Sequence, residues 1–213
     1  MRKRLVSKNA NAPTDAGGGR KMIVLGVDGS LTCTGLAVIA TDGVPGTEQV
    51  LDTGTVRTRP GDGDDTDRCE TIALGCVALA KRYQVKLTGV EMPYVDPAKS
   101  IKVALRLEAL KATVTRALKL AGFEVIPVMA SSRAKALGVS GKLKRELAKP
   151  QVIAAVLSRY GLELTEDECD AIGVALAAVA KHRKQERNQV QLGLGIKAGR
   201  RRRRKVMDHA DEA

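Results

Sequence analysis

Short apolar runs bounded by turn residues divide the middle of the chain into strands. The first run, 22–27, is nearly continuous and ends at Asp28-Gly29-Ser30, the pattern of a buried strand that meets a tight turn. We expect five strands in all, at 22–27, 36–40, 50–57, 85–90 and 123–128. Short connections join the first three, so these are expected to form an antiparallel meander.

Helical spacing of apolar residues marks the segments between and after these strands. The pattern predicts helices near 72–83, at 99–121, from Pro150 to Tyr160, and from Thr165 into the apolar run 171–180. Thr165 and Glu168 have the spacing of a capping box, with Thr165 as the N-cap. The segment 130–149 is expected to be a basic connection. This order predicts an α/β fold, in which a mixed sheet is covered by helices.

The helix expected at 99–121 is apolar on two sides. One stripe runs through Val103, Leu107, Leu110, Val114, Ala117 and Ala121, and a second through Ile101, Leu105, Ala109 and Ala112. A helix with two apolar stripes is usually buried on two sides, so one stripe is expected to pack on the sheet. The other stripe would contact a neighbouring helix or a partner subunit. A wholly internal helix explains the same pattern and stays open as an alternative.

Length and composition limit the organisation of the chain. With 213 residues it can bury one sizeable core, and we expect a disordered basic arm at 1–21, a folded domain at 22–185 and a flexible basic tail at 186–213. No apolar run is long enough for a transmembrane helix, and no apolar stretch follows the basic N-terminus as in a secretory signal. The four cysteines lack metal-finger spacing, so reduced thiols are expected.

The net charge of +12 is unevenly distributed along the chain. Residues 1–21 carry +5, residues 181–205 carry +10, and the last eight residues carry −3, which leaves the middle neutral. Within that middle, 99–149 holds twelve Lys and Arg against three Glu. A surface that only needs to be well solvated intersperses the two signs. The sorting therefore favours a polyanionic partner, with an ordinary basic protein as the alternative.

Acidic residues stand where predicted elements begin or end. Asp28 follows the first strand, Glu91 ends the fourth, and Asp167 and Asp170 lie in the first turns of the last helix, where three-residue spacing puts them on one face. Converging carboxylates repel each other unless a cation neutralises them, so Mg²⁺ or Mn²⁺ is the expected ligand. Two such ions, roughly 3.5–4 Å apart, would activate water and stabilise the leaving oxygen of a phosphodiester.

Each acid also has a structural explanation. Asp28 fits ordinary turn chemistry, and Asp167 fits the helix dipole. Glu91 is the hardest to explain in that way, because it puts a charge directly on the end of an apolar strand, and a buried acid needs a partner.

Three motifs give the chain its resemblance to a known family. Ile23-Val24-Leu25-Gly26-Val27-Asp28 with Gly35, Val90-Glu91, and Asp167-Glu168-Cys169-Asp170-Ala171 stand in the order found in RuvC Holliday-junction resolvases. The resemblance spans about 22–184 and implies an RNase H-like mixed five-stranded sheet flanked by helices. It also implies that Asp28, Glu91, Asp167 and Asp170 hold two Mg²⁺ or Mn²⁺ ions per site in an enzyme that resolves four-way junctions. The two-faced helix at 99–121 and the need for paired cuts across a junction predict a homodimer. The expected location is the cytoplasm of a bacterial cell or phage-infected host.

The resemblance extends to DNA-contacting residues. Tyr94 falls where these enzymes place an aromatic residue that stacks on a base at the branch point, and Lys149 resembles the basic catalytic residue that precedes the penultimate helix. Arg133 and Lys135 compete for a second such role. Further candidates for contact with DNA are Lys142, Lys144, Arg145 and the run Arg200, Arg201, Arg202, Arg203 and Arg204.

Departures from the family pattern keep other functions open. Gly29 stands where an Asp-Pro-Gly turn is common, and the basic tails extend beyond the usual catalytic domain. Both indicate broader action on three-way or flap DNA, as in viral members of the group. The alternatives are an RNase H-like nuclease that processes ribosomal RNA and a non-catalytic DNA-binding module. A sugar-kinase or actin-like ATPase would need a second homologous domain, which the chain is too short to contain.

Overall fold

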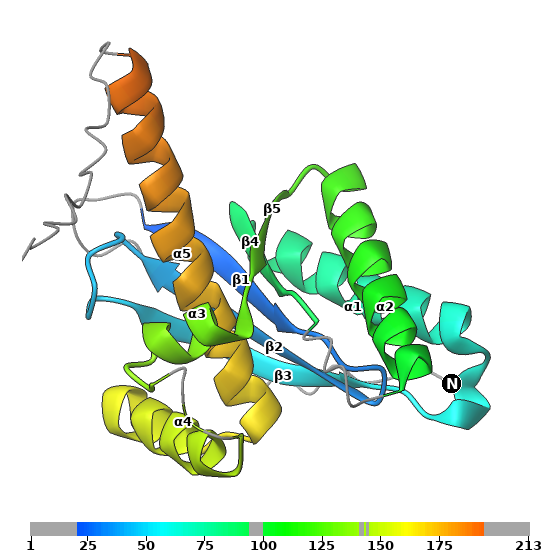
Figure 1. Cartoon of the computed structure of the whole chain (residues 1–213). Helices are drawn as coiled ribbons and strands as arrows, with labels where there is room; N and C mark the ends of the chain where they lie inside the picture. Colours follow the sequence, from blue (N-terminus) through cyan, green and yellow to red (C-terminus); the bar gives the residue numbers. More distant parts are fainter. Residues whose placement is uncertain (1–20, 94–99, 141–142, 144, 194–213) are drawn as a thin grey trace, which may run out of the picture. The chain divides into compact units, whose positions relative to one another are not determined.

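Five strands form a single sheet in the computed structural model, which describes residues 21–93, 100–140, 143 and 145–193. The sheet order is β3-β2-β1-β4-β5 (Figure 1). The strands are β1 (Met22–Asp28), β2 (Cys33–Thr41), β3 (Gln49–Arg57), β4 (Leu87–Glu91) and β5 (Glu124–Val128).

The sheet is mixed, as expected. β1, β2 and β3 form the antiparallel meander, whereas β4 pairs parallel with β1 and β5 pairs parallel with β4. Because β1 and β4 run in the same direction, their carboxyl ends lie at the same edge of the sheet. Val27 pairs with Val90, so the next residues along the two strands, Asp28 and Glu91, leave the sheet side by side.

Helices cover both faces of the sheet. After a short 3₁₀ turn, η1 (Pro60–Asp62), the helices α1 (Asp65–Arg82) and α2 (Ile101–Leu120) pack on one face. The other face is covered by α3 (Ala130–Ala136), α4 (Arg145–Tyr160) and α5 (Glu166–Gly193) (Figure 1). Adjacent residues of β1 divide between the two cores: Val24 packs with α5, and Leu25 packs with α1 and α2. Burial on both faces explains why β1 is a continuous apolar run.

Glycines allow α5 to lie close against the sheet. A Cβ atom on Gly26 of β1 would lie 2.0 Å from the carbonyl oxygen of Ala171, and one on Gly35 of β2 would lie 2.0 Å from that of Asp167. Either contact would be a severe clash, so no other residue fits without moving the helix. The glycines thus bring the first turns of α5 next to the end of β1.

Several boundaries differ from those expected from the sequence. The segment 130–149 contains the whole of α3, and α4 begins at Arg145, so Pro150 lies inside a helix that it was predicted to open. α5 continues to Gly193, beyond the boundary expected at 185. The basic arm and the run of arginines from Arg200 lie outside the described residues.

Two other expectations concern the helices and the cysteines. Within the described part of the chain, none of the helices is both long and apolar enough to cross a membrane. Cys33, Cys69, Cys76 and Cys169 are all free thiols.

Candidate active site

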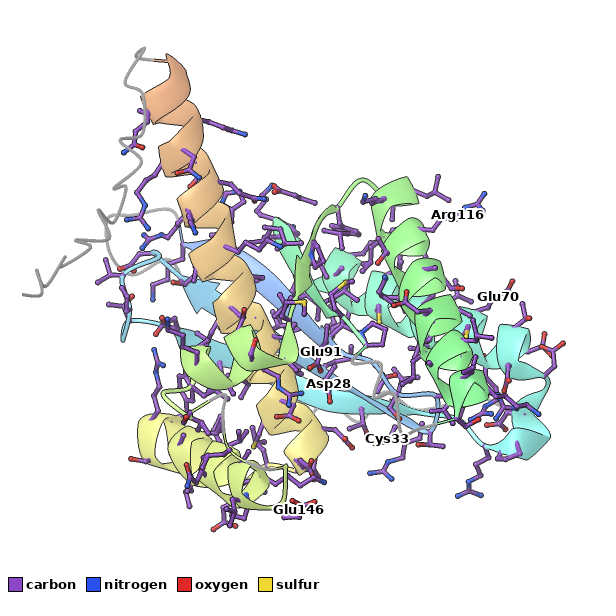
Figure 2. All side chains as sticks on the ribbon, in the orientation of Figure 1. Asp28, Cys33, Glu70, Glu91, Arg116 and Glu146 are labelled. Carbon is purple, nitrogen blue, oxygen red and sulfur yellow. The ribbon has the colours of Figure 1, made fainter. Side chains whose placement is uncertain are left out.

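Asp28 and Glu91 meet where β1 and β4 end. Their side chains lie close together at the edge of the sheet (Figure 2), and the carboxyl group of Glu91 raises the pKa of Asp28. The pair is therefore a place where negative charge is crowded.

The first turn of α5 supplies the other two acids. Glu168 accepts hydrogen bonds from the backbone N–H of Thr165 at 3.0 Å and from its hydroxyl at 2.8 Å, which confirms the predicted capping box. A third hydrogen bond, from Thr53 of β3 at 3.1 Å, fixes Glu168 to the sheet. Because Glu168 is used in this way, Asp167 and Asp170 are left to face the end of β1. Asp170 is buried, and its carboxylate repels that of Asp28.

Arg133 of α3 lies among three of these acids. Its Nη1 is 2.9 Å from Glu91 Oε2, 3.0 Å from Asp170 Oδ2 and 3.4 Å from Asp28 Oδ1. The close approach depends on Gly173 of α5, because a Cβ atom there would lie 2.8 Å from Cγ of Arg133. Four elements, β1, β4, α3 and α5, thus place one cation and three carboxylates around a common point.

The electrostatics of this cluster are dominated by burial. Burial, the hydrogen bond with Glu91 and the charge of Glu91 raise the pKa of Asp28 well above its ordinary value, although Arg133 opposes the shift. Burial likewise raises the pKa of Asp170 to about 7, with repulsion from Asp28 and Glu166 adding to the effect against Arg133. Burial of Arg133 works against its charge, but Glu91, Asp170 and Asp28 together raise its pKa. One guanidinium therefore does not neutralise the cluster.

Asp167 has a neighbour that sequence reasoning missed. Cys33, the first residue of β2, lies next to Asp167, and burial, followed by its interaction with Asp167, raises the pKa of the thiol to about 11. Arg57, which pairs with Cys33 in the β2–β3 register, contributes a positive charge on the same thiol. The strand register was the signal that could have found them, because Cys33 and Gly35 point to the face of the sheet that α5 covers.

The other predicted basic residues lie at different places. Lys149 of α4 pairs with Glu166, with Nζ 2.7 Å from Oε2, one residue before Asp167. Lys135 of α3 is exposed, and Arg145 is the first residue of α4. Tyr94, Lys142, Lys144 and the run from Arg200 to Arg204 lie outside the described residues, so their roles remain predictions.

The donor set fits divalent ions by its chemistry. Three carboxylate oxygens face a single cationic nitrogen, and oxygen-rich, negatively charged surroundings are those that Mg²⁺ and Mn²⁺ prefer. With their side chains oriented as they are, no three His, Cys, Asp or Glu residues in the described part of the chain form a group that could hold a metal ion. Here the carboxylates of Asp28, Glu91 and Asp170 are oriented toward Arg133 instead.

Comparison with known proteins identifies the family to which this chain belongs. The family of crossover junction endodeoxyribonuclease RuvC matches residues 24–179. The chain belongs to the RuvC family. A crossover junction endodeoxyribonuclease RuvC from Prochlorococcus marinus is 30% identical over 161 residues, which are 73% of this chain and 96% of that relative. The chain is thus a structure-specific endodeoxyribonuclease, in a family whose nucleases depend on divalent metal ions.

Solved structures agree with this fold. A Thermus thermophilus RuvC structure has a TM-score of 0.64 at 23% identity and covers 77% of this chain and 97% of its own. T. thermophilus RuvC in complex with a Holliday junction substrate has a TM-score of 0.62 at 21% identity, with 76% and 96% covered. The RNase H-like mixed sheet flanked by helices, predicted from the RuvC resemblance, is therefore confirmed.

The family also decides between the functional alternatives. The two alternatives of a ribosomal-RNA-processing nuclease and a non-catalytic DNA-binding module are not supported, because the matching family and curated relative are junction endonucleases. The third, an ATPase with two homologous domains, does not fit a single five-stranded sheet that matches RuvC along its length.

Proposed function

We propose that this chain cuts four-way DNA junctions by metal-dependent hydrolysis of a phosphodiester, with Asp28, Glu91, Asp167 and Asp170 as the metal ligands. The convergence of Asp28, Glu91 and Asp170 on one nitrogen of Arg133 carries this proposal. Two Mg²⁺ or Mn²⁺ ions held there would activate the attacking water and stabilise the leaving oxygen. Broader action on three-way or flap DNA, in the cytoplasm of a bacterial cell or phage-infected host, belongs to the same proposal.

The acids are organised to hold cations strongly. Asp28 and Asp170 have raised pKa values, because their negative charges are buried next to other acids. A divalent cation offsets this repulsion more fully than a single guanidinium can, since it brings twice the charge into the same low-dielectric site. The burial that makes the empty cluster costly thus favours a metal ion of high charge.

Arg133 is the basic residue best placed to act on the scissile phosphate. Its guanidinium already reaches the carboxylates that would hold the metal, so a phosphate bound there lies within its range. When metal takes over the neutralisation of the acids, the guanidinium is released to donate hydrogen bonds to phosphate oxygens. Lys149 pairs with Glu166, the residue before Asp167, and is proposed as a second phosphate contact.

A homodimer is the assembly that we propose for this function. In the single chain, Leu110 and Val114 of α2 are buried against α1, whereas Ile101 and Leu105 are 77% and 65% exposed. This excludes a wholly internal helix within one subunit. The exposed stripe Ile101, Leu105, Ala109 and Ala112 matches a second copy, because a two-fold axis through α2 would cover the same stripe on both subunits. Two sites related in this way would cut a junction symmetrically.

Replacement of Asp28 by Asn tests the proposal directly. The variant keeps the size of the side chain but loses the ligand charge, so it should bind a four-way junction as the parent does and cut it at least a hundredfold more slowly with Mg²⁺ or Mn²⁺. A gel assay with four-way, three-way, flap and linear DNA measures both quantities. Undiminished cutting by Asp28→Asn would remove Asp28 from the reaction, and with it the proposed metal site.

A further inference from the structure

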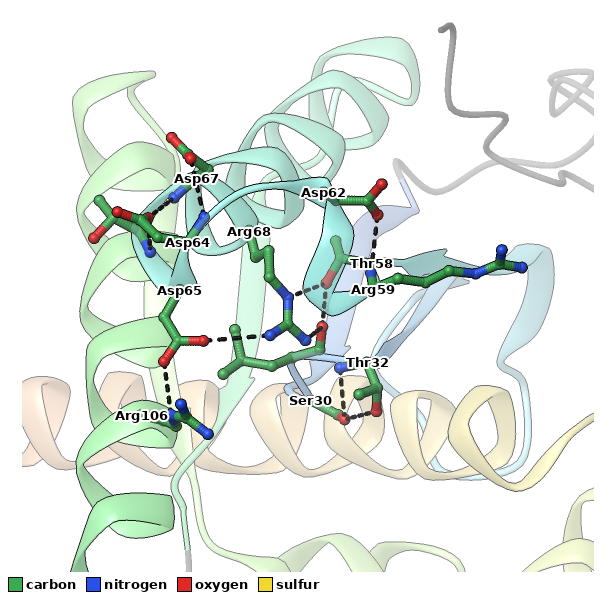
Figure 3. Close-up of polar contacts among 12 residues, drawn as sticks. Ser30, Thr32, Thr58, Arg59, Asp62, Asp64, Asp65, Asp67, Arg68 and Arg106 are labelled. Carbon is green, nitrogen blue, oxygen red and sulfur yellow. Dashed lines mark hydrogen bonds and ion pairs between the residues drawn. The ribbon is translucent and has the colours of Figure 1, made fainter.

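Arg68 of α1 lies at the centre of a polar network at the turn between β1 and β2, which follows Asp28. Its side chain is almost fully buried, with Nε 3.0 Å from the hydroxyl of Thr58 and Nη2 3.0 Å from the carbonyl oxygen of Leu31 (Figure 3). Thr58 itself donates its hydroxyl to the same Leu31 carbonyl and its N–H to the carbonyl of Thr32. The guanidinium therefore fixes the turn between β1 and β2, which begins at the residue after Asp28.

The turn needs this support because of where it lies. Asp28 is repelled by Glu91 and Asp167. The residue that follows it is a glycine, whose backbone is more flexible than that of any other residue. Ser30 and Thr34 bond to each other within the hairpin, so they do not connect the turn to the rest of the protein. Arg68 and Thr58 make that connection, through α1 and the end of β3.

The same network continues to α2. Arg68 Nη1 lies 3.3 Å from Asp65 Oδ1, and the other oxygen of Asp65 lies 2.6 Å from Nε of Arg106 (Figure 3). Arg106, Asp65, Leu105 and Ala109 also line a groove of about 360 Å³ between α1 and α2. Leu105 and Ala109 belong to the exposed stripe on which the second subunit is proposed to dock. A subunit seated there would cover the pair of Arg106 and Asp65 and remove it from water.

We propose that Arg68 is a positioning residue of the nuclease, which holds the β1–β2 turn behind Asp28 and, through Asp65 and Arg106, ties that turn to the subunit interface. This inference rests on the proposed function. Docking of the second subunit strengthens the pair of Arg106 and Asp65, because ion pairs shielded from water are screened less. Asp65 then holds Arg68 in its contact with the turn, so each site is fully ordered only in the assembled dimer.

The test compares single-turnover cutting with binding of the same four-way junction. At saturating protein, Arg68→Gln should lower the cutting rate at least tenfold and leave the Kd for the junction in metal-free buffer within twofold. Arg68→Lys should recover part of the rate, since it keeps a donor near Leu31 but loses the planar guanidinium. Arg82→Gln, at the far end of the same helix, removes the same charge and should leave both quantities unchanged.

Hydrogen exchange distinguishes positioning from a general loss of stability. In folded Arg68→Gln, amides of 29–34 should exchange at least tenfold faster while those of 69–82 keep their rates. If α1 exchanges faster to the same extent, or if the folded variant cuts at the parental rate, the positioning role is wrong. Should Arg68→Gln fail to fold, the half-exposed Arg106→Gln carries the test, with about a threefold slower rate in the dimer and faster exchange in 29–34. Parental values for both would overturn the link to the interface.

The outcome with Asp28→Asn separates this inference from the proposed function. If that variant still cuts, the metal site is wrongly assigned, whatever Arg68 does. If that variant is inactive while folded Arg68→Gln is fully active, the proposed function stands and only the positioning role fails.

Discussion

Arg133 Nη1 lies 3.0 Å from Asp170 Oδ2, yet the pKa of Asp170 is raised to about 7. Burial and the neighbouring acids thus outweigh a direct ion pair with arginine. The folded chain binds this proton more tightly than the unfolded chain, whose carboxyl titrates near 3.8. The stability that this proton binding gives the folded chain is fully present below the ordinary pKa of 3.8, and it is lost as the pH rises through about 7.

Asp170→Asn should therefore stabilise the metal-free protein at alkaline pH. The free energy of unfolding should exceed that of the parent by about 2–4 kcal/mol at pH 8, and the difference should nearly vanish at pH 4. Urea unfolding in the presence of a chelator at the two pH values measures it. Glu70→Gln, on the surface of α1, is the control for loss of one negative charge. An equal effect at both pH values would show that repulsion at Asp170 is not its cause.

Binding of a metal ion should offset the repulsion among the buried acids and so stabilise the folded protein. Added Mg²⁺ should stabilise the parent by about 2.7 kcal/mol at a hundredfold excess over its Kd, because the ion binds the folded acids and not the unfolded chain. Asp28→Asn and Glu91→Gln should lose most of that gain. Thermal unfolding with and without Mg²⁺ detects the effect independently of cutting. Full stabilisation of Glu91→Gln would place the metal away from β4.

Much of the fold could be predicted because its signals are local. The five apolar runs correspond to β1–β5, and the spacing of Thr165 and Glu168 identified the start of α5. These signals depend on neighbouring residues, which the sequence shows directly. The helix α3 was missed because Ala130–Ala136 has no stripe of large apolar residues, and Pro150 was a poor marker for the start of α4 because it lies a turn inside that helix.

The site could be predicted only in part, since convergence depends on tertiary packing. The acids were found from their positions at element ends, but the contact of Arg133 with three of them needs α3 to pack over Gly173. Arg133 is 105 positions from Asp28 and 42 positions from Glu91, and no spacing rule covers such separations. Arg68 was missed for a related reason, because its bond to the turn goes to the backbone carbonyl of Leu31, 37 positions away, which no side-chain pattern marks.

The exposed stripe of α2 predicts the oligomeric state. Leu105→Glu should convert the dimer to a monomer at micromolar concentration, because it buries an unpaired charge at the interface without disturbing the core of one subunit. Light scattering measures the mass. Leu74→Glu, at a comparably exposed leucine of α1, is the matched control and should leave the mass unchanged. A parent that is itself monomeric under these conditions would contradict the proposed assembly.

The role of Tyr94 at the branch point stays a prediction. Tyr94→Ala should weaken cutting of a four-way junction by roughly 1–3 kcal/mol if a stacked base is lost, and should leave binding of linear duplex DNA unchanged. Tyr94→Phe, which retains the aromatic ring, should behave as the parent. Equal losses of Tyr94→Ala on junction and duplex would assign the residue to general DNA affinity.

The basic run beyond α5 is expected to attach the enzyme to DNA without regard to sequence. Because α5 reaches Gly193, a deletion of 194–213 removes the run from Arg200 to Lys205 and leaves the helix intact. Each lost phosphate contact should reduce the slope of log K against log salt by about 0.9 for duplex DNA. The deletion should therefore weaken binding and flatten its salt dependence, while single-turnover cutting at saturating protein stays nearly unchanged. Serine in place of Arg200 to Arg204 should reproduce this result at full length, and a truncated enzyme that binds DNA normally but cannot cut would mean that the run helps to build the active site.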